Sequence, residues 1–184
     1  DFTPSVPLAK IPLGQRGDVQ YRPETGYEAT ALAVVDRPSG KWKTSNPAGF
    51  AAWVNEQARR QLLVQPLQKA EAMAQRADIR PVPSQEVPLS DTLRVAIRLF
   101  KRHRCMAVRR GHITAEFKPI SVIIVTLLTQ CYAGLADRHR LYNHPVELLA
   151  DLAVLLPAMV ECHNGQYVVA NPTVHGENFA ERWN

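Results

Sequence analysis

Three prolines within eight residues divide the chain and limit what it can fold into. The segment from Arg80 to Pro88 reads RPVPSQEVP. Proline lacks a backbone N–H and restricts the residue before it to extended conformations, so this segment cannot be helical. We expect it to cross the surface as a connector between two parts, residues 1–80 and residues 81–184.

The part before the connector mixes strand and helix signals. Residues 27–36 predict a strand that leads into the turn DRPSG, and a short second arm with Trp42 completes a β-hairpin. The tripeptide SNP at 45–47 is typical of a capped helix start. This helix places three apolar side chains on one buried face: Phe50, Trp53 and Val54. A second helical stretch is expected to reach about Ala77.

The part after the connector is mainly helical. Ser90 is expected to cap a helix over 91–104, which a polar and basic loop over 105–117 separates from the next one. Two further helices are predicted from Lys118-Pro119 to about 132 and over about 145–160. A strand over 165–171 and a short helix over 172–183 follow. The fold class is therefore α+β.

The helix after the connector carries a basic stripe. Its four cations recur at i, i+4, i+7 and i+8 and therefore share one face: Arg94, Arg98, Lys101 and Arg102. Like charges at these spacings repel one another, so a bound polyphosphate would relieve them. A solvated basic face is the simpler reading of the same pattern.

The start of the following helix has the features of an anion site. Lys118 precedes Pro119, and Ser121 falls within the first turn. Unpaired N–H donors and the positive end of the helix dipole meet at such a position. The remainder of this helix is apolar on nearly every side, so we expect a buried element that holds the site rigidly. In the alternative reading, Ser121 is only a tolerated polar residue near a helix end.

Composition narrows the class of protein further. The net charge of +5 and the pI near 9.3 favour anionic partners. No apolar run approaches the ~20 residues that a membrane span needs. Three widely spaced cysteines fit a reducing compartment, so a cytoplasmic protein is expected. There is no CxxC pair for zinc and no GxSxG elbow for a hydrolase.

Four blocks of the sequence resemble one enzyme family. They read WKTSNPAGFAAWV from Trp42, LRVAIRLFKRHR from Leu93, KPISVIIVTLLTQCY from Lys118 and NPTVHGENFAERW from Asn171. Together they look like the C-terminal half of the bacterial CD-NTases, which are relatives of oligoadenylate synthase and cyclic GMP-AMP synthase. The resemblance implies the end of a nucleotidyltransferase β-sheet core followed by a helical lobe that grips the nucleotide.

The resemblance also implies roles for single residues. A lysine and a serine that contact the triphosphate of the donor nucleotide in the family match Lys101 and Ser121, and Lys118 is a weaker candidate. The opening DFTP matches the strand that carries the third metal-binding carboxylate, which makes Asp1 the expected catalytic acid and metal ligand. The NPTVHGEN block lies near the nucleotide in relatives, although its polar residues also suit a turn and a helix cap.

The expected function is that of a template-independent nucleotidyltransferase. It joins nucleoside triphosphates into cyclic di- or trinucleotide messengers of antiphage signalling, with Mg²⁺ or Mn²⁺ held by carboxylates. A nucleic acid or a regulatory protein is a further expected partner. Members of the family carry two further metal-binding carboxylates after a Gly-Ser motif. This sequence contains neither the motif nor those two acids, so we expect a fragment that is inactive by itself. The alternatives are a non-catalytic nucleotide- or RNA-binding module and a linear RNA nucleotidyltransferase.

Overall fold

The computed structural model describes residues 5–36, 39–60, 62–64 and 89–184, which form two compact units of mixed α and β structure. The first unit comprises Asp1–Glu56, Pro119–Thr126 and Val160–Asn184, and the second comprises Gln57–Lys118 and Leu127–Met159. The chain therefore passes between the units several times. No helix of the described residues is long and apolar enough to span a membrane.

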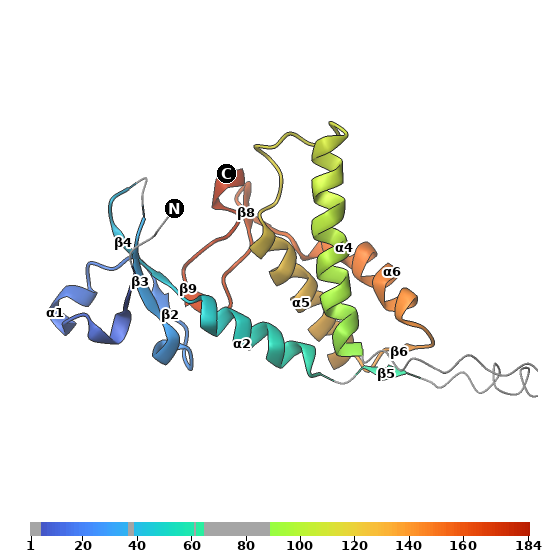
Figure 1. Cartoon of the computed structure of the whole chain (residues 1–184), viewed down its shortest axis with the longest axis horizontal. Helices are drawn as coiled ribbons and strands as arrows, with labels where there is room; N and C mark the ends of the chain where they lie inside the picture. The colour runs from blue at the N-terminus through green and yellow to red at the C-terminus, as the bar shows by residue number, and fades with distance from the viewer. Residues whose placement is uncertain (1–4, 37–38, 61, 65–88) are drawn as a thin grey trace, which may run out of the picture. The chain divides into compact units, whose positions relative to one another are not determined.

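A three-stranded antiparallel sheet forms one side of the first unit, in the order β1-β3-β4 (Figure 1). The strands are β1 (Ser5–Pro7), β3 (Leu32–Val35) and β4 (Trp42–Ser45). Pairing of Val35 with Trp42 sets the register of the predicted hairpin, which is confirmed. The first arm is shorter than expected, because Glu28–Thr30 forms a 3-10 turn. The N–H of Ala31 closes this turn by donating to the Glu28 carbonyl at 3.3 Å.

The turn of this hairpin is held by one carboxylate. Asp36 accepts hydrogen bonds from the Ser39 hydroxyl at 2.7 Å and from the Ser39 N–H at 3.1 Å. Lys43 lies 3.6 Å from the same side chain. The Ser39 hydrogen bonds are the main cause of a lowered pKa of Asp36, and Lys43 adds to it. The carboxylate therefore stays ionised where it stabilises the turn.

The predicted helix start at Pro47 is confirmed, and α2 spans Pro47–Ala58. The buried Asn46 caps it: its Oδ1 accepts from the N–H of Gly49 at 2.9 Å, while its Nδ2 donates to the Tyr27 carbonyl at 2.8 Å. One amide therefore joins the helix start to the segment before β3. The expected apolar face of α2 is only half-buried, and Phe50 stacks on Trp53 at 5.7 Å between ring centroids.

The last residues of the first unit depart from the prediction. In place of a helix over 172–183, the chain forms turns, β9 (Val174–His175) and a 3-10 turn (Glu181–Trp183). β9 pairs with β2 (Arg22–Pro23), so this block is fixed to the N-terminal segment. The helix fails because Gly176 has a φ of +84° and because asparagine side chains take up the backbone groups.

The predicted strand over 165–171 is shorter and belongs to a hairpin, whose arms are β7 (Glu161–His163) and β8 (Gln166–Val168). Asn184 closes the outer edge of β8. Its Oδ1 accepts from the N–H of Tyr167 at 2.7 Å, and its Nδ2 donates to the Tyr167 carbonyl at 3.0 Å. The rings of Tyr167 and Trp183 meet edge to face beside this contact.

In the second unit α4 packs on α6. α4 spans Leu89–Arg109, α6 spans Pro145–Leu155 with a 3-10 turn over Leu156–Met159, and α5 (Ser121–Asp137) contributes residues to both units. Two short parallel strands complete the unit: β5 (Leu63–Val64) and β6 (Leu141–Tyr142). The predicted helix over 145–160 is confirmed in its place and type. The second helical stretch, predicted to reach Ala77, is not helical where the structure describes it, because Arg59 and Arg60 form a turn and Leu63–Val64 is the strand β5. Residues 65–77 of this stretch and the connector over 80–88 lie outside the described residues.

Three predicted helix boundaries in this region are wrong. α4 begins before Ser90, which is therefore not its cap, and continues five residues past 104 into the expected loop. The helix ends where Gly111 adopts a φ of +73°, the N–H of His112 donates to the Ala107 carbonyl and that of Gly111 donates to Val108. No glycine or proline interrupts it earlier. α5 starts at Ser121, two residues beyond Pro119.

Gly49 and Gly134 offer a matched test of the α2 cap, since both are helical glycines. A Cβ on Gly49 would lie 2.6 Å from Nδ2 of Asn46, whereas one on Gly134 meets nothing within 4 Å. We expect Gly49→Ala to expel the cap and to lower the free energy of unfolding by about 1–2 kcal/mol. Gly134→Ala should raise it by up to about 1 kcal/mol, because alanine restricts the unfolded chain. Urea unfolding measures both, and equal effects would contradict the assigned cap.

Candidate functional site

Ser121 is the first residue of α5 and is half-buried. The prediction that it falls in the first turn of this helix is confirmed. The first turn of any α-helix leaves its N–H groups without an intrahelical partner, and the helix dipole places partial positive charge there. Lys118 lies three residues earlier and is exposed. This stretch has the local features that bind a phosphate group.

The helix behind this position is buried or half-buried from its start to Ala136. No residue of α5 before Asp137 is exposed, and four of its large side chains are almost completely enclosed: Leu127, Leu128, Tyr132 and Leu135. At its far end the Tyr132 hydroxyl donates to the Arg60 carbonyl at 3.3 Å, and Arg60 forms an ion pair with Asp137. The expectation of a central buried element is confirmed. Such a helix keeps its first turn in a fixed place within its surroundings.

Lys101 lies in the middle of α4 and is half-buried. Its neighbours on the predicted basic stripe, Arg98 and Arg102, are exposed, so this face of the helix is open in the way that the spacing predicts. Lys101 and Lys118 belong to the second unit, whereas Ser121 belongs to the first. Each residue is therefore placed within its own unit, and their convergence on one triphosphate stays a prediction.

Asp1, the expected metal-binding carboxylate, lies outside the described residues. Among the residues that the structure does describe, no three His, Cys, Asp or Glu side chains come together as a metal site. Of the three cysteines, Cys105 and Cys162 are exposed and Cys131 is buried.

The polar residues of the NPTVHGEN block form hydrogen bonds within the block. Asn171 donates to the Glu177 carboxylate at 2.6 Å and accepts from the N–H and the hydroxyl of Thr173 at 2.9 and 3.0 Å. Asn178 accepts from the N–H groups of Val169 and Ala180, both at 2.9 Å. These amides stabilise a compact turn. Of the two roles that the sequence allows for this block, ligand binding or a turn, the hydrogen bonds show the turn.

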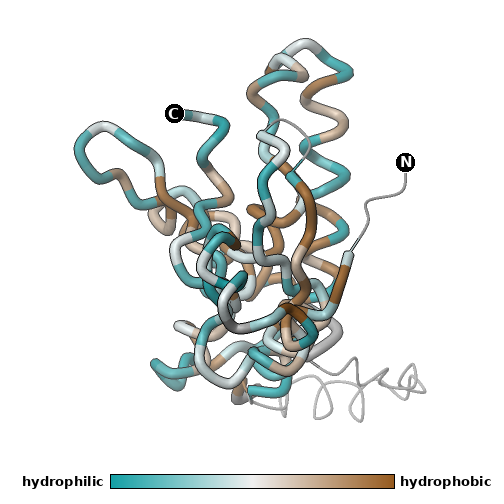
Figure 2. The backbone as a smooth tube through the Cα atoms, turned by 90° about the vertical axis from the view of Figure 1, so that its left-hand side faces the viewer, coloured by the Kyte–Doolittle hydropathy of each residue, from teal (hydrophilic) through white to brown (hydrophobic). Residues whose placement is uncertain are grey.

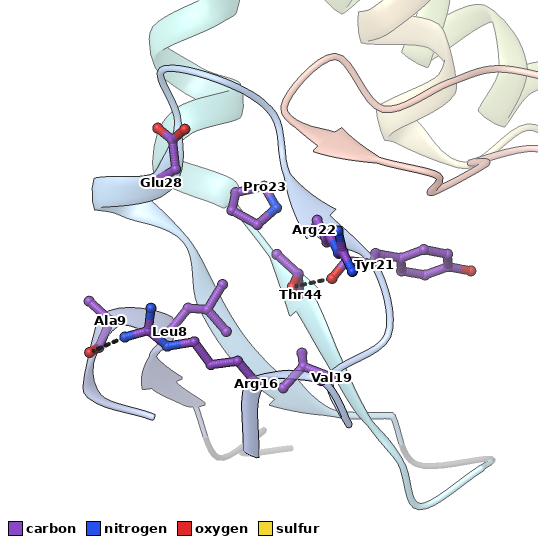
Figure 3. A pocket seen from close by; sticks show the side chains of 10 residues that line it. Leu8, Ala9, Arg16, Val19, Tyr21, Arg22, Pro23, Glu28 and Thr44 are labelled. Carbon is purple, nitrogen blue, oxygen red and sulfur yellow. Dashed lines mark hydrogen bonds between the residues drawn. The ribbon is translucent and has the colours of Figure 1, made fainter. Parts of the chain in front are cut away.

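Sequence reasoning missed a pocket of about 450 Å³ in the first unit, which is open to solvent (Figure 3). It is lined mainly by the segment before β3: Leu8, Ala9, Arg16, Gly17, Val19, Tyr21, Arg22, Pro23, Glu28 and Thr44. No motif or spacing in this segment signals a site.

Most polar groups of this pocket are used inside the protein. Arg16 extends along its base and donates to the carbonyls of Ile11 and Ala9, each at 2.8 Å. The Thr44 hydroxyl donates to the Tyr21 carbonyl at 3.0 Å, and the Tyr21 ring points away from the other lining residues (Figure 3). Glu28 accepts from the N–H of Gly26 at 2.9 Å. The arrangement mainly fixes the segment over 8–16, which consists of a 3-10 turn (Leu8–Lys10) and the short helix α1 (Leu13–Arg16), and it presents few unused groups to a ligand.

The three thiols should differ in reactivity. Burial raises the pKa of Cys131 to about 11, so its thiol stays protonated up to pH values at which a thiol in the unfolded chain has ionised. At pH 8 a thiol reagent such as Ellman's should label Cys105 and Cys162 within minutes and Cys131 only in denaturant. The double variant Cys105→Ala/Cys162→Ala isolates the buried thiol. Rapid labelling of this variant in its folded state would contradict the described packing of α5.

No protein-family model matches the chain, and no curated protein matches it. The likeness to CD-NTases therefore depends on the four sequence blocks alone. The roles expected for Asp1, Lys101, Lys118 and Ser121 stay predictions.

Proposed function

We propose that the chain is the nucleotide-gripping half of a template-independent nucleotidyltransferase of the CD-NTase type. The observation that carries this proposal is the start of α5, where Ser121 opens a helix whose body is buried on nearly every side. A helix N-terminus held in this way suits a phosphate group, because its donors are already oriented before the ligand arrives. The basic stripe around Lys101 supplies the charge that a triphosphate needs.

In this proposal the residues of the chain bind and orient the substrate. The Ser121 hydroxyl and the first turn of α5 donate hydrogen bonds to phosphate oxygens, while the ammonium group of Lys101 neutralises their charge. Mg²⁺, held by Asp1 and by acids that this sequence lacks, would assist attack of a ribose hydroxyl on the α-phosphate with release of pyrophosphate. The product would be a cyclic oligonucleotide, as the resemblance implies.

Binding of a triphosphate tests the proposed grip without any need for catalysis. A non-hydrolysable ATP analogue is titrated into the chain by calorimetry. Lys101→Ala should weaken binding about 10–100-fold, because it removes a charge-assisted contact, and Ser121→Ala should weaken it up to about tenfold. Lys10→Ala, which removes an exposed lysine of the first unit, is the matched control. If all the variants bind the analogue with equal affinity, Lys101 and Ser121 do not bind the triphosphate.

Catalysis is tested with the complete product of the gene. Incubation with labelled nucleoside triphosphates and Mg²⁺, followed by chromatography, should give cyclic products. Asp1→Asn should abolish their synthesis and leave the affinity for the ATP analogue within about twofold, because it removes only a metal ligand. A linear polymer would favour the RNA nucleotidyltransferase, and normal synthesis by the Asp1 variant would exclude this residue as a metal ligand.

A further inference from the structure

The hairpin of β7 and β8 turns on an asparagine–glycine pair. Asn164 has a φ of +53° and Gly165 a φ of +80°, and the flanking residues His163 and Gln166 pair with each other. Two residues with positive φ between paired strands form a type I′ turn, for which Asn-Gly is the preferred sequence. The turn favours this pair, and the pair brings a chemical reactivity with it.

The two reactive groups are the carboxamide of Asn164 and the backbone nitrogen of Gly165. The ladder of the hairpin closes with the pair of His163 and Gln166, so the N–H of Gly165 lies inside the loop and is not bound by the opposite strand. No hydrogen bond of the Asn164 side chain is found in the described part of the chain. Both residues are exposed, and Gly165 has no Cβ that would shield its nitrogen.

Three other asparagines of the chain are excluded from such a reaction. Asn46 and Asn171 precede proline, whose nitrogen has no hydrogen to lose. Asn178 is half-buried, and its amide forms hydrogen bonds through both its oxygen and its nitrogen. Asn164 is the one asparagine of the sequence that is followed by glycine.

We propose that Asn164 is a site of spontaneous deamidation. The backbone nitrogen of Gly165 loses its proton to a base in the solvent and attacks Cγ of Asn164. A bond between this nitrogen and Cγ forms, the bond between Cγ and Nδ2 breaks, and ammonia leaves with a proton that the solvent returns. Water then opens the succinimide ring at either of its two carbonyl groups, which gives aspartate or isoaspartate. In balance, one water is consumed and one ammonia is released.

Local opening of the hairpin controls this reaction. The left-handed backbone of Asn164 holds the Gly165 nitrogen away from Cγ, so the bond between Cα and the carbonyl carbon must rotate before the ring closes. This rotation breaks the turn. A two-stranded hairpin with three residues in each arm is only marginally stable by itself, so its tip opens far more often than the whole chain unfolds.

The amide of Asn184 holds the hairpin closed by its two hydrogen bonds to Tyr167, at 2.7 and 3.0 Å. We call this contact the Asn184 clasp. Tyr167 is 47% exposed, and the last residues of the chain, at the end marked C in Figure 2, are mainly hydrophilic. Water therefore competes for the clasp, and the rate of deamidation should rise when the clasp is lost.

Isoaspartate would change the hairpin more than aspartate would. Its main chain runs through Cβ and gains one atom, so a two-residue turn no longer matches the register in which His163 pairs with Gln166. Deamidation would thus loosen the pairing of β7 and β8 in aged molecules. The reaction goes beyond the proposed nucleotide grip and uses none of its residues, so either proposal can fail without the other.

Peptide mapping by mass spectrometry tests the site during several weeks in mildly alkaline buffer, where each deamidation adds about 1 Da. Asn143 lies on the same tryptic peptide, over 141–182, and precedes histidine, so it is the internal control. We expect Asn164 to deamidate at least about tenfold faster than Asn143, because Gly165 has no side chain that hinders the attack. Comparable rates at the two positions, or an unmodified Asn164, would overturn the proposal.

A pair of variants tests the control by hairpin opening. Asn184→Ala should raise the deamidation rate of Asn164 about three- to tenfold, because it removes two hydrogen bonds from β8. Asn55→Ala removes an exposed asparagine of α2 and should leave the rate within about twofold. Circular dichroism and the thermal midpoint verify that both variants fold. If Asn184→Ala leaves the rate unchanged, opening of the hairpin does not control the reaction.

The consequence for the hairpin is measured on the separated products. Ion exchange isolates the isoaspartyl form, and Asn164→Asp is its matched control, since it has the same added charge on a normal backbone. Amide hydrogen exchange over 161–168 should be at least about tenfold faster in the isoaspartyl form. Equal exchange in the two would contradict the loosening of the hairpin. The affinity of both for the ATP analogue should equal that of the unmodified chain, which keeps this test separate from the grip.

Discussion

The structure depends on the burial of α5. Its residues from Ser121 to Ala136 are all buried or half-buried, and some of them belong to one compact unit and some to the other. The hydrophobic effect places this helix inside, and the price is that it must accept two threonine hydroxyls, Thr126 and Thr129, which have no hydrogen-bond partner among the described residues. The polar contacts described for the helix lie in its C-terminal part, where the Tyr132 hydroxyl donates to the Arg60 carbonyl and Asp137 pairs with Arg60.

Hydrophobic periodicity and caps made part of this fold predictable. The hairpin at β3 and β4, the start of α2 at Pro47 and the helices α4, α5 and α6 all follow from local signals, because each is stabilised by neighbours close in sequence. The end of α4 was misplaced since the Schellman turn at Gly111 is signalled by one glycine alone. The strand pairs β2 with β9 and β5 with β6 join segments far apart in the chain, and no local pattern encodes such partners.

The residues of the candidate site were likewise predictable only in part. The position of Ser121 in a first helical turn was predictable from Pro119 just before it, and the shared face of the basic stripe was predictable from the period of α4. The role of the asparagines after Val169 was not, since a side-chain amide can serve a ligand or a turn equally well until its hydrogen bonds are known. The pocket beside Arg16 had no sequence signal, because it arises from the path of two very short helical turns that contacts of Arg16 with two carbonyls hold together.

The contact between Asn184 and Tyr167 has a further consequence for the hairpin of β7 and β8. The Asn184 amide binds both the N–H and the carbonyl of Tyr167, in the way that a neighbouring strand would, and Nδ2 of Asn178 donates to the same carbonyl at 2.9 Å. An open strand edge is a template on which another chain can add, and this is a common route to aggregation. The side chain of Asn184 therefore works as a one-residue substitute for a missing strand and makes this edge a poor seed for self-association.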